Sequence, residues 1–474
     1  MIRVPQTGNL LIKLPSDSQS PTTPLLLANT YVTFGVRDFH PIDYAHAGHT
    51  KICERNGIAP TTFYHRVEFI YQKCLAFLER YEGRLNDVEF DDLYLASDSF
   101  IYMLNNIRRK GKGGSKQSRQ EKANATEAMT YMISTGDVES FYVFRSDICY
   151  DTFVRLDDIK KDTEIYHCDH TFPYLRKNDR IRFFTYEPQE PTPSDSETTL
   201  DYLDKKSFFD ARDNFVEGLH IQQNYTITAH MHLLKRALNV KRFIFTSDND
   251  GTIKQSISRV FKDEFKDEQA YYFTSQYDKT LDRKDAFEES IKAKKELNDW
   301  IKATGSKAKF VYEKAIEKVS SDLFYHDFET AKIINGKAIQ MPTNKLYPHP
   351  LPAIDEGRRY MNLINPKGYI GYDDLAEMLV KSNTRVVDDF FQEIRRHLNI
   401  LERPLVGARG TGKTYIYANY NPKYAQQLVT IYRTYYNFCK PRKFYNRKKA
   451  DTTPAMRIGI ANKVYSLREV IYFI

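Results

Sequence analysis

The chain has 474 residues, with 70 Lys and Arg against 62 Asp and Glu, a formal charge of +8 and a pI near 8.9. This length is enough for two or three domains with a substantial core, and the mild basic excess permits a polyanionic partner without requiring one. The five cysteines include no C-x-x-C pair, which excludes a disulfide framework and a zinc ribbon. Because neither a signal peptide nor a membrane-spanning apolar run is present, we expect a soluble protein of the cytoplasm with no membrane partner.

The N-terminal part of the sequence predicts a DNA-binding domain. Residues 1–30 form a flexible segment, because 13–24 are rich in Ser, Pro and Thr. A helix-turn-helix is expected over 31–107, with a second helix that begins at Pro60 after a tight turn. A packing stripe of this helix is expected at Val67, Ile70, Cys74, Phe77 and Leu78. Its first turns would contact base edges and phosphates through Thr61, Thr62, Tyr64, His65 and Arg66. The alternative is a helical hairpin that touches no DNA.

Two basic runs predict non-specific contacts with DNA phosphates, although charge runs are more often merely solvated. The first opens a linker over 108–125 and the second follows a late helix near the C-terminus. The residues concerned are Arg108, Arg109 and Lys110 in the first run, and Arg442, Lys443, Arg447 and Lys448 in the second.

Residues 407–414 match the pattern G-x-x-x-x-G-K-[ST] of a phosphate-binding loop. Such a loop needs a strand before it and a helix after it, whereas here a helix precedes it and an extended run follows. We therefore expect a basic hairpin in which Lys413 touches DNA phosphate or solvent, and no nucleotide cofactor.

The rest of the chain predicts an α/β catalytic core over 126–278 and 340–474, interrupted by a charged helical insertion over 279–339. Apolar, β-rich runs at 128–135, 141–149 and 180–186 suggest an antiparallel start to the sheet. A further strand over 240–247 stops at Asp248, a helix follows at once, and 270–274 suits one more strand.

Three acids suit a site for divalent cations. Phosphoryl transfer on DNA uses two cations about 4 Å apart, held by carboxylates from separate elements. Asp248 follows a buried strand, where open α/β sheets place ligands. Asp388 lies at the edge of the buried stripe of a helix over 385–401, formed by Val387, Phe391, Ile394, Leu398 and Leu401. Asp137 ends the first strand of the core, although it could equally be a hairpin-turn aspartate.

Most of the chain resembles the DDE-type transposases of bacterial insertion sequences. Residues 386–391 (VVDDFF) are similar to their helix with the third acid, and Arg433-Thr-Tyr-Tyr-Asn437 with Thr453-Pro-Ala-Met456 is similar to their R-x-Y-Y-N and T-P-A-M signature. The segments 394–398 (IRRHL), 401–404 (LERP) and 420–422 (YNP) resemble a subgroup with Asp as third acid. The spacing from Asp248 to Asp388 exceeds that of many such enzymes, which leaves Glu356 open as the alternative third acid.

This resemblance implies an RNase H-like core, with a mixed sheet flanked by helices, an N-terminal helix-turn-helix domain and a helical insertion. The implied reaction is metal-dependent cleavage at the ends of a mobile element, followed by attack of the freed 3′-hydroxyl on target DNA. Mg²⁺, or Mn²⁺ in its place, would be held by Asp137, Asp248 and Asp388, because both ions prefer carboxylate oxygens. The partners would be double-stranded DNA and further copies of the chain on DNA in a bacterial nucleoid. An inactive DNA-binding regulator and a nuclease without strand transfer remain alternatives.

Overall fold

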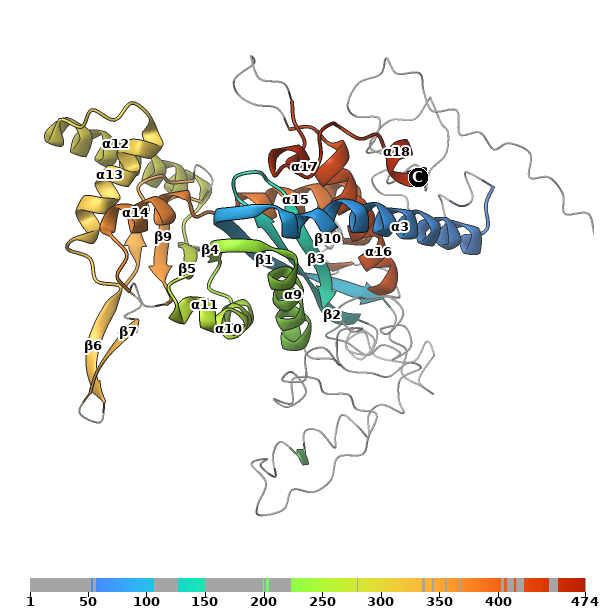
Figure 1. Ribbon diagram of the computed structural model, residues 1–474, viewed down its shortest axis with the longest axis horizontal. Coiled ribbons are helices and arrows are strands. Elements are labelled where there is room, and N and C mark those ends of the chain that lie inside the picture. Colours follow the sequence, from blue (N-terminus) through green and yellow to red (C-terminus); the bar gives the residue numbers. More distant parts are fainter. Residues whose placement is uncertain are drawn as a thin grey trace, which may run out of the picture.

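A computed structural model describes residues 53, 57–105, 127–149, 199, 202–203, 223–278, 280–334, 337–342, 345–353, 356–365, 368–401, 405–406, 413–414, 422–442 and 451–473. A seven-stranded mixed sheet with the order β3-β2-β1-β4-β5-β9-β8 forms its centre (Figure 1). The strands are β1 (Glu89–Asn105), β2 (Glu127–Asp137), β3 (Val143–Cys149), β4 (Asn239–Ser247), β5 (Ala270–Tyr277), β8 (Tyr347–Pro348) and β9 (Arg359–Leu363).

The direction of the strands changes across the sheet. β3, β2 and β1 are antiparallel neighbours, β1, β4 and β5 run parallel, and β9 is antiparallel to β5. The antiparallel start predicted from the sequence is therefore confirmed for the strands at 128–135 and 141–149, and the strands at 240–247 and 270–274 are also present. The predicted strand over 180–186 lies outside the described residues.

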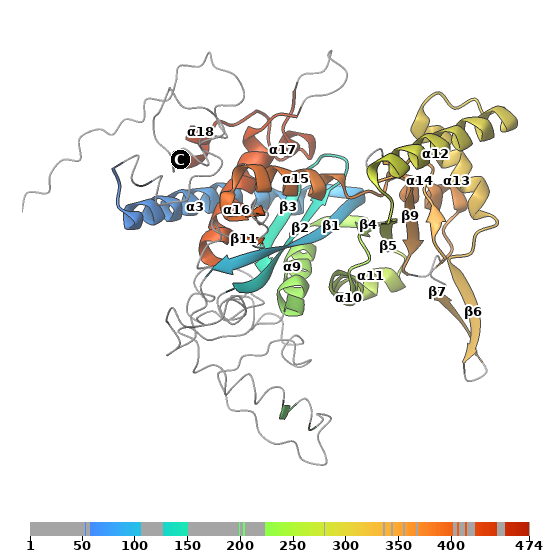
Figure 2. The same ribbon diagram turned by 180° about the vertical axis from the view of Figure 1, so that it is seen from behind.

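Helices cover both faces of the sheet (Figures 1 and 2). On one face, α9 (Gln223–Ala237) packs on β2 and β3 and against α10 (Gly251–Val260). On the other, α15 (Arg385–His397) packs on β1, β2 and β3. Two consecutive residues of β2 face the two helices on opposite sides of the sheet. Thr135 forms a hydrogen bond with His230 of α9, whereas a Cβ at Gly136 would meet Val386 of α15.

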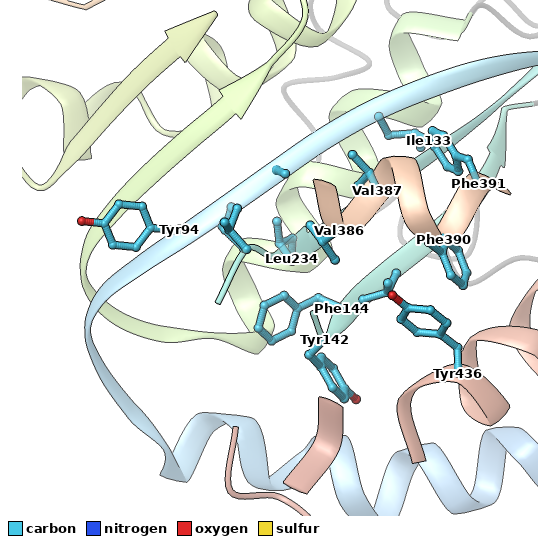
Figure 3. Packing of buried hydrophobic residues seen from close by; sticks show 14 of the residues in the cluster. Tyr94, Ile133, Tyr142, Phe144, Leu234, Val386, Val387, Phe390, Phe391 and Tyr436 are labelled. Atoms are coloured by element: carbon cyan, nitrogen blue, oxygen red, sulfur yellow. The ribbon is translucent and has the colours of Figure 1, made fainter. Parts of the chain in front are cut away.

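The apolar stripe of α15 fastens this helix to the sheet. Val386, Val387, Phe390 and Phe391 are buried, and Figure 3 shows them among the side chains of the strands and of the C-terminal helices. Burial of one such side chain stabilises the fold by about 1.5–3 kcal/mol. The stripe predicted for this helix is buried at all five positions, Val387, Phe391, Ile394, Leu398 and Leu401.

The C-terminal helices form a layer beside the edge strand β3. They are α16 (Pro422–Thr434), the π-helical turn η6 (Tyr435–Cys439), α17 (Pro454–Arg457) and α18 (Leu467–Ile471). Arg433 Nη1 donates hydrogen bonds to the backbone carbonyls of Val143 and Phe144 at 3.1 and 2.5 Å. Asn437 Oδ1 accepts from Val143 N at 3.0 Å, and its Nδ2 donates to Val143 O at 2.8 Å. The R-x-Y-Y-N residues therefore bind the free edge of β3.

Helix α3 (Pro60–Glu82) belongs to this same layer. It packs against α16 and α18 through its buried stripe, including Val67, Ile70, Cys74, Phe77 and Leu78 as predicted. Glu82 at its end forms an ion pair with Arg433. The first helix of the predicted helix-turn-helix falls on residues that the structure does not describe, apart from Cys53. The helix-turn-helix therefore stays a prediction.

The insertion contains two long helices, α12 (Arg283–Thr304) and α13 (Val311–Leu323), and the hairpin of β6 (Glu329–Ile334) and β7 (Lys337–Pro342). The following α14 (Tyr372–Lys381) packs against α13. The expected helical insertion over 279–339 is thus partly a β-hairpin, which extends past its predicted end. The remaining short elements are η2 (Gly83–Asp87), α11 (Lys262–Lys266), η5 (Asn399–Leu401), β10 (Leu405–Val406) and β11 (Lys413–Thr414).

One predicted boundary needs correction. The sequence analysis places 89–105 in the DNA-binding domain, whereas β1 lies at the centre of the seven-stranded sheet. The strand has the exposed acids Asp91 and Asp92 near its start, which do not suggest a strand, and its buried part begins at Leu93. No helix among the described residues is long and apolar enough to cross a membrane.

Candidate active site

Two aspartates lie side by side on neighbouring parallel strands. Ser97 of β1 is paired with Ser247 of β4, so the next residues, Asp98 and Asp248, are adjacent in the same direction. Neighbouring strands are about 4.8 Å apart, and residues at matching positions point to the same face. Asp248 follows the last residue of β4 and is exposed, while Asp98 is half-buried. The two carboxylates therefore lie side by side on the same face of the sheet, at the C-terminal end of β4.

Helix α15 brings a third aspartate to this face. Asp388, Phe391 and Arg395 are spaced three and four residues apart and share one side of the helix. The Phe391 ring contacts that of Phe100 with centroids 4.8 Å apart, and the Arg395 guanidinium lies 4.7 Å from the same ring. Phe100 follows Asp98 by two residues and points to the same face of β1.

The charges of the three aspartates act on one another. Burial is the main cause that raises the pKa of Asp98 to about 7, and the nearby carboxylates of Asp248 and Asp388 add to it. The pKa of Asp388 is also raised, first by burial and then by Asp248 and Asp389, against a hydrogen bond donated by Thr384 Oγ1 at 2.7 Å. The positive charge of Arg395 lowers the pKa of Asp98 and of Asp388. Negative charge is thus concentrated at this point.

The donor set suits a hard cation. Carboxylate oxygens are the preferred ligands of Mg²⁺ and Mn²⁺, and a cation would relieve the mutual repulsion of the three aspartates. Within the described residues, no group of three or more His, Cys, Asp or Glu side chains is already arranged to hold a metal ion. The three carboxylates fit such an ion in chemistry, and side-chain movement would have to bring them together to coordinate it.

Asp137 lies on the face of the sheet opposite to Asp98. It ends β2 opposite Leu95, and residues 95 and 98 of a strand point to opposite faces. Its Oδ2 accepts a hydrogen bond from Ser140 N at 2.8 Å, which closes the turn between β2 and β3. Burial raises its pKa to about 6, and the other groups that act on it are Ser140 and Glu139 of the same turn. Asp137 therefore has the surroundings of a hairpin-turn aspartate, the alternative that the sequence left open, and Asp98 is the aspartate that lies beside Asp248.

Glu356 is exposed and precedes β9. Its charge raises the pKa of Tyr277, as does that of Asp388, but burial is the larger cause. Glu356 is absent from the main charges that act on Asp98 and Asp388. The structure therefore brings Asp388, rather than Glu356, to the other two aspartates.

Hydroxyl groups behind the aspartates hold the strands in register. Ser97 Oγ and Thr135 Oγ1 share a hydrogen bond of 2.8 Å, and Thr135 bonds to His230 Nε2 at 2.8 Å. His230 Nδ1 is 2.6 Å from Asp147, whose pKa is far below its usual range: although burial opposes this, Arg145 and His230 together lower it. These hydrogen-bonded side chains are all buried, so they form a structural link between β1, β2, β3 and α9.

Sequence reasoning missed Asp98, although a signal was present. Residues 95–98 (LASD) and 245–248 (FTSD) both place a Ser-Asp pair after apolar residues of a strand. Their serines are partners across the sheet, and Ser247 Oγ contacts Tyr272 Oη at 2.6 Å on β5. The acidic residues before Leu93 led to the assignment of this segment to another domain.

The predicted DNA contacts in α3 have mixed surroundings. Thr61 and His65 are exposed, Thr62 and Arg66 are half-buried, and the Tyr64 ring lies 4.2 Å from that of Tyr424. The start of α3 thus presents polar groups while Tyr64 packs on α16.

Of the basic residues predicted to contact DNA near the C-terminus, the structure describes Arg442. Arg442 Nη1 pairs with Asp389 Oδ2 at 2.5 Å, and its guanidinium lies 4.0 Å from the Phe141 ring. Arg442 therefore anchors its loop to α15. The remaining predicted contacts, Arg108, Arg109, Lys110, Lys443, Arg447 and Lys448, lie outside the described residues.

The segment that matches a phosphate-binding loop is flanked by two paired strands. β10 and β11 are antiparallel, with Leu405 opposite Thr414 and Val406 opposite Lys413. This pairing agrees with the predicted hairpin, while residues 407–412 and the Lys413 side chain lie outside the described part.

Comparison of the chain with protein-family models, with curated proteins and with solved structures gives no match.

Proposed function

We propose that this chain is a DDE-type DNA transposase with an RNase H-like core, whose metal-binding acids are Asp98, Asp248 and Asp388. The observation that carries the proposal is the meeting of these three aspartates from β1, β4 and α15 on one face of the sheet. They are 150 and 140 residues apart in the sequence, from 98 to 248 and from 248 to 388. Such convergence from separate elements is what two-cation phosphoryl transfer requires.

The arrangement of strands supports the RNase H-like assignment. The sheet begins with three antiparallel neighbours and continues with parallel strands, as expected from the resemblance to insertion-sequence transposases. The signature residues Arg433 and Asn437 also have a clear role, since they hold the edge strand β3. The proposal therefore gives these signature residues a structural role in the catalytic core.

In the proposed reaction, Asp98, Asp248 and Asp388 would hold Mg²⁺ or Mn²⁺, and the bound ions would supply Lewis-acid activation of the attacking oxygen and stabilisation of the leaving oxygen. Asp98 on β1 and Asp248, directly after β4, would fix the position of the scissile phosphate. Asp388 completes the site from a helix whose position is set by its buried stripe. Arg395 lowers the net negative charge, which helps a polyanionic strand to approach. Further copies of the chain would assemble on the DNA, because two ends must be joined.

A strand-transfer assay tests this function. The purified chain is incubated with Mg²⁺, a supercoiled target plasmid and labelled DNA that carries the sequences on either side of its gene. We expect the labelled 3′ end to become joined to the plasmid. Asp98→Asn, Asp248→Asn and Asp388→Asn should each reduce joining by at least about a thousandfold, since each removes a ligand of the reacting centre.

Asp137→Asn and Glu356→Gln serve as matched controls and should retain joining. Cleavage without joining would identify a nuclease. Binding of the labelled DNA without either reaction, in the unmodified chain, would identify an inactive regulator and contradict the proposal.

A further inference from the structure

Arg359 is a buried cation with no acidic partner among the residues that the structure describes. It is the first residue of β9 and is 7% exposed. No carboxylate of the described residues forms an ion pair with it, and its Nε is enclosed without a hydrogen-bond partner among them. A buried, unpaired charge costs several kcal/mol in general. An enclosed donor of this kind is therefore a candidate for contact with a ligand.

The surroundings of Arg359 add positive charge and polar groups rather than acids. Burial and the charge of Arg385 lower the pKa of Arg359, and only the phenol groups of Tyr277 and Tyr312 act in the other direction. Arg385 begins α15 and is exposed. Ser275, two residues before Tyr277 on the same face of β5, also has an enclosed hydroxyl with no partner among the described residues.

This group lies beside the three aspartates. The register aligns Ser247 of β4 with Thr274 of β5, so the next residues, Asp248 and Ser275, share a face. Arg359 is the cross-strand partner of Tyr277 on the following strand, β9. Two strand spacings separate β4 from β9, or about 10 Å. Figure 2 shows β9 beside β5, between the aspartate-bearing strands and the insertion.

The geometry points to a phosphate-binding site: we infer that Arg359, with Arg385 and Tyr277, binds a backbone phosphate of the DNA strand whose scissile phosphate lies at Asp98 and Asp248. This inference rests on the proposed function and names a substrate contact of the same site.

The chemistry and the spacing both favour a phosphodiester. Two guanidinium groups and a phenol are donors that suit phosphate oxygens. Arg359 is also two residues further along the strands than Asp248, which makes the separation about 12 Å. Phosphates of one strand recur every 3.4 Å or so along the duplex axis, so this separation corresponds to about three to four nucleotides. The acids would hold the reacting phosphate with metal ions, while Arg359 would hold a nearby phosphate without them.

Salt-dependent DNA binding tests the inference without any chemistry. The full chain and its variants are titrated with a fluorescent duplex of the DNA next to the gene, in EDTA, at several NaCl concentrations. Loss of one phosphate contact lowers the slope of log K against log salt by about 0.9. We expect this decrease in Arg359→Gln and the unmodified slope in Arg359→Lys.

Arg358→Gln is the matched control. Arg358 is the neighbouring residue, but its guanidinium pairs with Glu296 at 2.7 Å, so its loss should leave the slope unchanged. Melting temperatures separate a ligand contact from a structural role. Because Arg359 has no acidic partner within the described part of the chain, Arg359→Gln should be at least as heat-stable as the unmodified chain.

Two results would overturn the inference. An unmodified slope in Arg359→Gln, with strand transfer intact in the parent chain, rejects this contact alone. Absence of salt-dependent binding and of strand transfer in the parent chain rejects both this contact and the proposed function.

Discussion

Asp98 and Asp137 are close in the sheet but differ in what surrounds their carboxylates. Asp98 is influenced by two other carboxylates, Asp248 and Asp388, and is half-buried. Asp137 is more deeply buried, yet its hydrogen bond to the Ser140 amide satisfies it within its own turn. Burial alone therefore does not identify a functional acid. Neighbouring like charges make Asp98 the better candidate, because such charges are brought together only at a cost in stability.

The raised pKa of Asp98 predicts a pH-dependent stability. Its pKa in the folded chain is about 7, against 3.8 for the free side chain, so the folded state binds the proton more tightly. Stability from this group is therefore present at low pH and is lost as the pH rises from about 4 to 7. In EDTA, Asp98→Asn should melt at a higher temperature than the unmodified chain at pH 8. The difference should shrink towards pH 4.

Thermal melting by circular dichroism from pH 4 to pH 8 measures this difference. Asp91→Asn is the control, because Asp91 is exposed and its pKa is lowered by Lys241. A constant difference between Asp98→Asn and the unmodified chain at every pH would contradict the account.

At the scale of elements, the position of α15 depends on close contact with β2. A Cβ at Gly136 would lie 2.8 Å from Val386 Cγ2 and 3.0 Å from Tyr142 O. Gly136 therefore lets the helix approach the sheet closely, and the helix bears Asp388. The strand and helix patterns of the sequence predicted both elements, but this contact joins residues 250 positions apart and has no local signal.

Gly136→Ala should destabilise the chain by about 1–3 kcal/mol, the usual cost of overpacking. In the double variant Gly136→Ala/Val386→Ala, the loss should be smaller than the sum of the two single losses, because the added methyl group enters the space that Val386 vacates. Urea denaturation of the four chains gives this double-mutant cycle. Simple additivity would show that Gly136 and Val386 do not limit the approach of α15.

Across the whole molecule, the sequence predicts features that depend on neighbouring residues better than features that depend on contacts between distant segments. Alternating or helical apolar patterns act within one element, and they predicted β2 to β5 and the buried stripes of α3 and α15. The choice of the first aspartate depended on the centre of the sheet, which no local pattern reveals. The segment 89–105 is predicted as part of the DNA-binding domain, because the acidic residues at its start do not suggest a strand, whereas it forms β1 inside the seven-stranded sheet.

The insertion between β5 and α15 explains the long spacing between the second and third aspartates. It contains α12, α13 and the β6–β7 hairpin, and the chain returns to the sheet through β9 before it reaches Asp388. The second and third aspartates can therefore meet although 140 residues separate them. The same return places Arg359 next to Tyr277.

Direct measurement of metal binding tests the central claim, that Asp98, Asp248 and Asp388 form one site from three distant parts of the chain. Mn²⁺ is titrated into the metal-free chain and followed by electron paramagnetic resonance, with Asp98→Asn, Asp388→Asn, Asp137→Asn and Glu356→Gln alongside. We expect Asp98→Asn and Asp388→Asn to weaken binding at least about tenfold, and the other two to bind as the unmodified chain does. Unchanged binding in Asp98→Asn together with lost binding in Asp137→Asn would contradict the account.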